Sequence, residues 1–213
     1  MNDRIYVWDR YVRTAHWTLA AAFFTAYLSG EEESLVHVYA GYLVGALVVS
    51  RIVWGLVGSR HARFTDFVRS PRAAIAYLRS LLGGPVVHYR GHNPAGGWMV
   101  ILLLASLGLT VTTGLEVYGL EGEGPLAVAE LQEVRPDSMS DDDVQALKAA
   151  KRARKRTEHF WEEVHETAAN LTLGLVVLHV AGVVLSSLRH RENLVRAMVT
   201  GFKEKRDDDT PAA

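Results

Sequence analysis

The chain has 213 residues, of which 49% are apolar and 22% are charged, and it contains no cysteine. The lack of cysteine excludes disulfides, thiolate zinc sites, thiolate-held iron–sulfur clusters and covalent haem attachment. Any metal site must therefore use histidine or carboxylate ligands. The net charge of -1 excludes no class of partner, because in a membrane protein the side on which charges lie matters more than their sum.

Apolar residues are gathered into blocks of about 18 to 23 residues, the length that a helix needs to cross a hydrocarbon core of about 30 Å. These blocks predict an all-α integral membrane protein, a four-helix bundle formed by a single domain, 1–213. The predicted spans are 12–29, 35–57, 94–117 and 168–188. The N-terminus lacks a small-residue cleavage pattern, so we expect the first helix to be retained.

Two longer polar connections separate the spans. Between the second and third, Pro71 to Leu82 is amphipathic and predicts a short helix lying at the membrane interface. Residues 118–157 are predicted as a loop outside the membrane, with a helical part from Asp141 to about Glu158. The tail 207–213 is predicted to be disordered.

The distribution of lysine and arginine predicts the orientation. The two tails and the second loop, counted with Arg13 at the start of the first span, lie on one side and carry 15 of these residues, against 7 on the other side. The positive-inside rule therefore places both termini in the cytoplasm. The basic cluster Lys151 to Arg156, on the opposite side, is an argument against this orientation.

Nine histidines occur in the chain, and their expected depth separates them. Five are expected to face solvent or lipid headgroups: His61, His88, His92, His159 and His190. The other four, His16, His37, His165 and His179, belong to the helices expected to span the membrane, with His165 in the amphipathic turns 160–167 that extend the fourth span outward. A histidine within an apolar span costs free energy unless it is paired or liganded, so a functional role is the first hypothesis for these four.

The four histidines of the expected membrane helices sort into two pairs of similar expected depth. His165 and His179 are 14 residues apart, which places them on nearly the same helix face and about 21 Å apart along the axis. His16 matches the depth of His179, and His37 matches that of His165. Two facing imidazoles with no carboxylate or thiolate beside them indicate haem with both axial positions filled, and hence one-electron transfer. The alternative is plain interhelical hydrogen bonding.

Further candidates surround these pairs. Gly41 and Gly45 follow His37 on nearly the same helix face, where a porphyrin needs space or where two helices pack closely. Arg13 and Arg51 are candidate partners for the propionates of the haem between His16 and His179. Positive-inside anchoring is the competing interpretation of both arginines.

Several segments resemble the bacterial dihaem cytochrome b family, which contains cytochrome b561 and the cytochrome b subunits of nickel–iron hydrogenases. They are VRTAHW, VHVYAGY, GHNPAGGW and VHETAANLTLGLVVLHVAGVVLSSLRHR. The resemblance implies a multi-pass protein of the bacterial inner membrane with two haem b groups. It also implies that His16 pairs with His179 and that His37 pairs with His165.

The function implied by the resemblance is electron transfer between a membrane quinone and an extracytoplasmic partner such as a cytochrome c or a hydrogenase. This partner is expected to dock near the loop 118–157, and the direction of electron flow stays open. One alternative is a self-contained oxidoreductase that couples superoxide or another small oxidant to quinone. A second alternative is a haem-free structural or proton-relay bundle. Membrane lipid is the expected surrounding, nucleic acid is not an expected partner, and a homodimer is left open.

Overall fold

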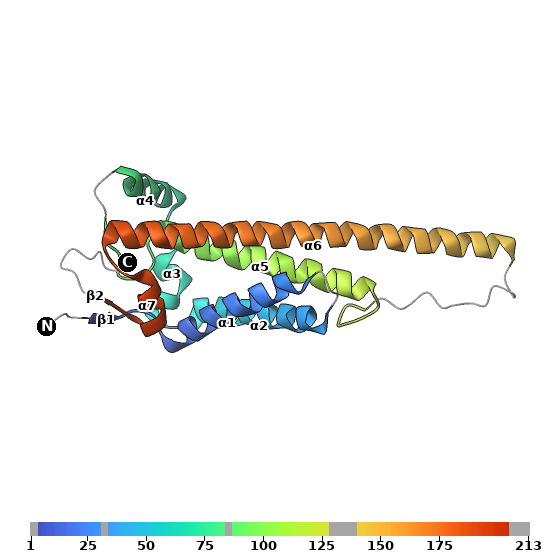
Figure 1. The fold of residues 1–213 in the computed structure, drawn as a ribbon, viewed down its shortest axis with the longest axis horizontal. Helices are drawn as coiled ribbons and strands as arrows, with labels where there is room; N and C mark the ends of the chain where they lie inside the picture. The colour runs from blue at the N-terminus through green and yellow to red at the C-terminus, as the bar shows by residue number, and fades with distance from the viewer. Residues whose placement is uncertain (1–3, 31–33, 84–86, 128–139, 205–213) are drawn as a thin grey trace.

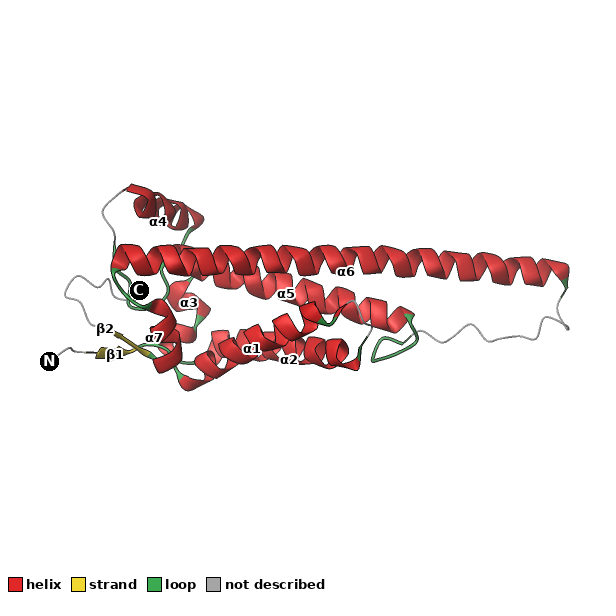
Figure 2. Cartoon of the chain, viewed as in Figure 1, coloured by secondary structure: helices red, strands yellow, loops and turns green. Residues whose placement is uncertain are grey.

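The computed structural model describes residues 4–30, 34–83, 87–127 and 140–204. Helices make up most of this part of the chain, and the two strands are short segments at one end (Figure 2). The elements in chain order are β1 (Arg4–Tyr6), α1 (Arg10–Leu28), α2 (Leu35–Val57), η2 (Arg60–Ala62), α3 (Phe64–Phe67), α4 (Pro71–Gly83), α5 (Pro94–Leu120), α6 (Asp141–His190), α7 (Leu194–Thr200) and β2 (Phe202–Glu204). The expectation of an all-α protein is confirmed.

Four helices, α1, α2, α5 and α6, run beside one another along the long axis of the molecule (Figure 1). Their shared core contains apolar side chains from the middle of the first three helices: Ala22, Phe23, Val44, Val48, Leu104 and Leu107. Leu173 and Val176 of α6 pack against this cluster. We call the end of the bundle that carries β1 and β2 the terminal end, and the opposite end, where α2 begins, the loop end.

Three helices are long and apolar enough to cross a membrane: α2, α5 and α6. The helix α1 is not among them, although it coincides with the first predicted span. The outward sides of α2 and α6 are apolar, as contact with lipid requires. Their exposed residues include Val49, Ile52, Val53, Leu56, Val177, Leu178, Val180 and Val184.

The helix α6 corrects the prediction of a separate loop helix and a fourth span beginning at residue 168. It is one continuous helix of 50 residues, or about 75 Å at 1.5 Å per residue, so the predicted loop 118–157 is divided between the end of α5, a connection and the first turns of α6. Ser140 begins the helix with a capping box, in which its hydroxyl accepts from the backbone of Asp143. Figure 1 shows this N-terminal part of α6 projecting well beyond the bundle.

At the terminal end, smaller elements close the bundle. The strands β1 and β2 pair antiparallel, with Ile5 opposite Lys203. The helix α4 was predicted over nearly the same residues, and it buries Ala74, Tyr77 and Leu81 on one side. The predicted disordered tail, 207–213, lies outside the described residues.

Candidate functional site

The histidines of the predicted spans lie in two pairs. At the terminal end, the ring centroids of His16 on α1 and His179 on α6 are 6.3 Å apart, with planes at 55°. Nearer the loop end, the centroids of His37 on α2 and His165 on α6 are 6.0 Å apart, with planes at 88°. The long helix α6 therefore contributes one imidazole to each pair.

Hydrogen bonds fix the imidazoles of the loop-end pair. Nδ1 of His37 lies 2.9 Å from the carbonyl of Ala26, and Nδ1 of His165 lies 3.0 Å from the carbonyl of Thr110. A carbonyl only accepts, so Nδ1 carries the proton in both rings. This leaves each Nε2 as the available metal ligand, and a histidine ligand characteristically donates its other N–H to such a partner.

The helix α5 contributes no imidazole to either pair, but its residues contact the ring of His165. The hydroxyl of Thr113 lies 3.1 Å from Nδ1 of His165. A Cβ at Gly114 would lie 2.9 Å from Cε1 of the same ring, so glycine is needed for this close approach. Sequence reasoning missed these residues, although the spacing of Thr110, Thr113 and Gly114 along one side of a helix was visible.

The terminal-end pair is held differently. Nδ1 of His16 is buried without a hydrogen-bond partner in the described structure. His16 also packs edge to face against Trp17, with ring centroids 5.1 Å apart. The orientation of this imidazole is therefore set by packing rather than by a hydrogen bond.

The two candidate glycines behave differently. A Cβ at Gly41 would meet nothing within 4 Å, so there is open space beside this part of α2. A Cβ at Gly45 would lie 3.0 Å from Val111 of α5, which favours close helix packing as its role. Of these two glycines, only Gly41 has open space beside it.

Both candidate arginines lie at the terminal end. Arg51 is buried, and one of its amino groups donates to the carbonyl of Ala62 at 3.1 Å. Its other amino group, NH1, is buried without a hydrogen-bond partner in the described residues. Arg13 donates through NH1 to the carbonyl of Val199 at 2.6 Å, and its Nε has no partner there. The unused group of Arg51, NH1, carries two N–H bonds, whereas the unused Nε of Arg13 carries one.

Four histidines expected to face solvent or lipid headgroups, His61, His88, His92 and His190, are buried or partly buried instead, which corrects that prediction. His190 is buried, with Nε2 2.9 Å from the hydroxyl of Tyr77 and Nδ1 3.0 Å from Nδ1 of His88. His92 packs between Trp8 and Phe67, with ring centroids 4.6 Å and 4.4 Å away. The prediction failed because it ignored the elements that fold back over the terminal end. His159 is exposed, as expected.

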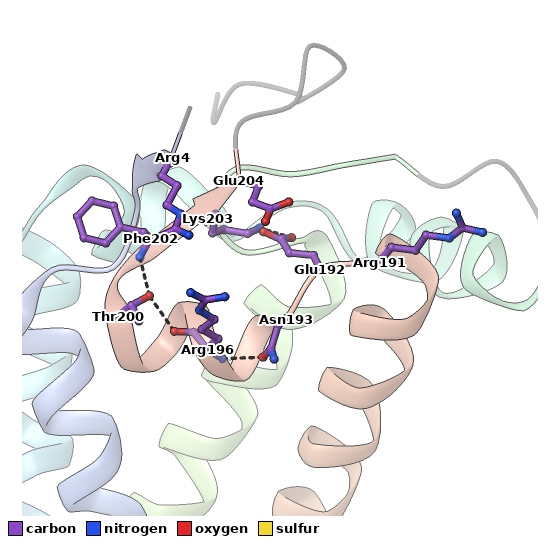
Figure 3. A pocket seen from close by; sticks show the side chains of 9 residues that line it. All are labelled: Arg4, Arg191, Glu192, Asn193, Arg196, Thr200, Phe202, Lys203 and Glu204. Carbon is purple, nitrogen blue, oxygen red and sulfur yellow. Dashed lines mark hydrogen bonds and ion pairs between the residues drawn. The ribbon is translucent and has the colours of Figure 1, made fainter. Parts of the chain in front are cut away.

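A separate polar hollow of about 80 Å³ lies at the terminal end, between the last turn of α6, α7 and β2 (Figure 3). Its lining includes Arg4, Arg196 and Glu204, and its Lys203 forms an ion pair with Glu192 at 3.1 Å. The hollow is polar and contains none of the paired histidines, so it is distinct from the imidazole sites.

The geometry of the pairs fits one metal atom between each pair of imidazoles. Two metal–nitrogen bonds of about 2 Å each, together with the radii of the two rings, span a separation of this size. No group of three or more histidines, cysteines or carboxylates that could hold a metal occurs in the part of the chain that the structure describes. A metal at either pair must therefore bring further equatorial ligands, as the nitrogens of a porphyrin would.

Comparison with known proteins agrees with this geometry. The model of the family described as prokaryotic cytochrome b561 matches residues 7–201. No curated protein and no solved structure gives a significant match. Membership of this family implies a b-type haem and electron transfer within a membrane. With two imidazole pairs inside a helical bundle and a family match over nearly its whole length, the chain belongs to the prokaryotic cytochrome b561 family.

Proposed function

We propose that the chain is a dihaem electron-transfer subunit that connects a membrane quinone with an extracytoplasmic redox protein. The observation that carries this proposal is the presence of two imidazole pairs on one helix, at His165 and His179. These residues are about 21 Å apart along the axis of α6. Two centres at different depths suit electron transfer from one membrane face toward the other.

In this proposal His16 and His179 hold one haem b, and His37 and His165 hold the other. When bound, the two haems would supply one-electron redox chemistry, and each would be held by the two imidazoles of one pair. The protein's part is orientation. Nδ1–H of His37 and Nδ1–H of His165 donate to backbone carbonyls, which keeps each Nε2 aimed at the iron. The open space at Gly41 accommodates the ring of the cofactor.

We propose that all four long helices cross the inner membrane and that both termini are cytoplasmic. The helix α1 falls short of the hydropathy of a span, yet it packs against α2 and contributes Phe23 to the common core. Arg51 and the arginines of the second loop gather at the terminal end, as the positive-inside rule requires of the cytoplasmic face. The terminal-end pair is then the inner site and the loop-end pair the outer site.

The projecting part of α6 is the proposed docking surface for the redox partner. It carries the basic cluster Lys151 to Arg156, whose side chains are mostly exposed. Such a cluster attracts a partner with an acidic surface. A helix reaching this far outside is more useful for contacting a protein than for binding superoxide, so a protein partner is favoured over the small-oxidant alternative.

The visible spectrum of the purified protein, oxidised and then reduced with dithionite, tests the proposed function. We expect the α-band of a b-type haem, and we expect partial reduction by a quinol analogue without dithionite. The absence of an α-band in protein purified with added haem would contradict haem binding. Reduction by superoxide but not by quinol, with no partner recovered, would favour the small-oxidant alternative.

A further inference from the structure

Two buried side-chain nitrogens without hydrogen-bond partners in the described residues lie at the terminal end of the bundle. Nδ1 of His92 and NH1 of Arg51 are both buried, and neither has a hydrogen-bond partner in the described residues. A buried donor without a partner costs free energy, so native proteins satisfy nearly all of them. An unsatisfied pair within one region indicates a ligand that accepts hydrogen bonds there.

The position of His92 connects this region to the inner imidazole pair. His92 lies just before α5, in the segment whose Asn93 caps the helix by accepting from the backbone of Gly96 at 2.7 Å. Charges on Arg51, Lys203, His179 and His61 all act on His92, and all of them disfavour its protonated form. His92 is therefore within electrostatic reach of both Arg51 and the inner ligand His179.

The sign of these charges defines the class of ligand. Burial, reinforced by the neighbouring cations, lowers the pKa of His92 to about 3. The ring is neutral at physiological pH, and it can donate one N–H without adding a second charge to that of Arg51. No carboxylate acts on His92 among these neighbours, so the ligand that completes the region is an anion.

The ring of His92 is also held rigidly. Trp8 packs against one side at 66° between ring planes, and Phe67 packs at 42°. The cap at Asn93 fixes the backbone of the adjoining residue. A donor fixed in this way is suited to a single acceptor position.

We propose that His92 and Arg51 together bind a propionate carboxylate of the haem held by His16 and His179. This inference rests on the proposed function and adds His92 to the residues that hold the cofactor. Arg51 supplies the charge, and His92 supplies a neutral N–H donor. A hydrogen bond from His92 offsets part of the negative charge of the propionate near the iron. Loss of this donor therefore disfavours the ferrous form, which carries one more negative charge, and lowers the reduction potential of the inner haem.

The potential of the inner haem tests this proposal. Each substitution is made in the His37→Ala background, in which only the inner haem remains, and the potential is measured by optical redox titration. His92→Phe keeps the aromatic packing but removes the N–H, and we expect a tenfold shift toward the ferric form, or about 59 mV for one electron. His92→Gln retains an N–H donor, and we expect its inner-haem potential to be closer to that of the parent than the potential of His92→Phe is. His159→Gln, at an exposed position, is the matched control.

Infrared difference spectra of the reduced and oxidised protein provide a second readout, because the propionate carboxylate bands are expected to shift in His92→Phe. Unchanged potential and unchanged carboxylate bands in His92→Phe would overturn the inference, even though the parent still binds haem. An equal decrease of the inner-haem potential in His92→Phe and His92→Gln would also overturn the inference, because altered packing would then explain both decreases. If His92→Phe does not accumulate, His92→Leu, which also lacks an N–H donor, takes its place, and an unchanged potential with unchanged carboxylate bands in that variant would contradict the proposal. A parent without any b-type spectrum would instead count against the proposed function.

Discussion

At the scale of single residues, the structure gives particular side chains more than one task. Asp9 caps α1 by accepting from the backbone of Val12 at 2.7 Å. Its other oxygen accepts from Nε1 of Trp54 at 3.0 Å and from the hydroxyl of Ser59. One carboxylate therefore joins the start of α1 to the end of α2 and the segment after it.

Replacement of Asp9 should make the free energy of unfolding less dependent on pH in the acidic range. Burial raises the pKa of Asp9, but hydrogen bonds from Ser59, Val12 and Trp54, with the charge of Arg51, outweigh it and leave the pKa below 3.8. The ionised carboxylate therefore stabilises the folded state above pH 3.8. This contribution is lost as the pH falls through the lower pKa that Asp9 has in the folded state. Asp9→Ala should cost about 1 to 2 kcal/mol at pH 7, as loss of a helix cap does.

Thermal unfolding in detergent at several pH values measures this effect. The gap between wild type and Asp9→Ala should narrow below pH 3.8, while Asp142→Ala on the exposed part of α6 should show little loss. A gap that is the same at pH 7 and at pH 3 would contradict the role assigned to the charge of Asp9.

A methyl group at Gly114 should disturb the outer haem alone. Its Cβ would lie 2.9 Å from Cε1 of His165, so the imidazole must move from its hydrogen bond with Thr110. We expect Gly114→Ala to lower the outer haem content by at least half, measured by haem extraction and pigment assay. Gly108→Ala, on the same helix with nothing within 4 Å of its Cβ, should retain both haems. Equal haem contents in the two variants would contradict the close approach.

At the scale of elements, hydropathy predicted some boundaries well and others badly. The second span, 35–57, coincides with α2 because Ser34 caps its start and its composition is apolar apart from a few residues such as His37 and Arg51. The continuity of α6 was missed because hydropathy averaged along the sequence differs sharply between the charged first part of the helix and its apolar second part. The absence of glycine and proline from Asp141 to Leu173 was the available signal that nothing interrupts the helix.

The candidate site was predictable to the same extent. Depth and helix face were sufficient to predict which histidines lie together, since both follow from residue spacing. The packing of His92 against Trp8 and Phe67 and the burial of His190 beside Tyr77 of α4 were not predictable, because they depend on segments that fold over the terminal end. The strands β1 and β2 are three residues each and pair across the whole chain, so no local pattern indicates them.

Register along α6 should matter only between its two histidines. Insertion of one alanine after Leu175 rotates His179 by about 100° relative to His165, so the helix can keep only one pair in place. We expect no more than one haem per chain in this variant. An alanine inserted after Ala150, in the projecting part, should leave two. Two haems in both insertion variants would mean that α6 does not serve both sites.

At the scale of the whole molecule, the proposed function depends on the orientation of the bundle in the membrane. Since the chain has no cysteine, single cysteines report sidedness without background. We expect Asp142→Cys to react with a membrane-impermeant maleimide in intact spheroplasts. Ser70→Cys, before α4, should react only after lysis. The reverse pattern would place the termini outside and exchange the inner and outer sites.

In the proposed arrangement, the four histidines hold two haems as two separate pairs. Haem content per chain, with the spectrum of the haem that remains, tests it most directly in single alanine variants of each histidine. We predict about one haem in every variant, with one residual spectrum shared by His37→Ala and His165→Ala and another shared by His16→Ala and His179→Ala. Different residual spectra within either of these two groups would contradict the pairing, and two haems in every variant would contradict ligation by these residues.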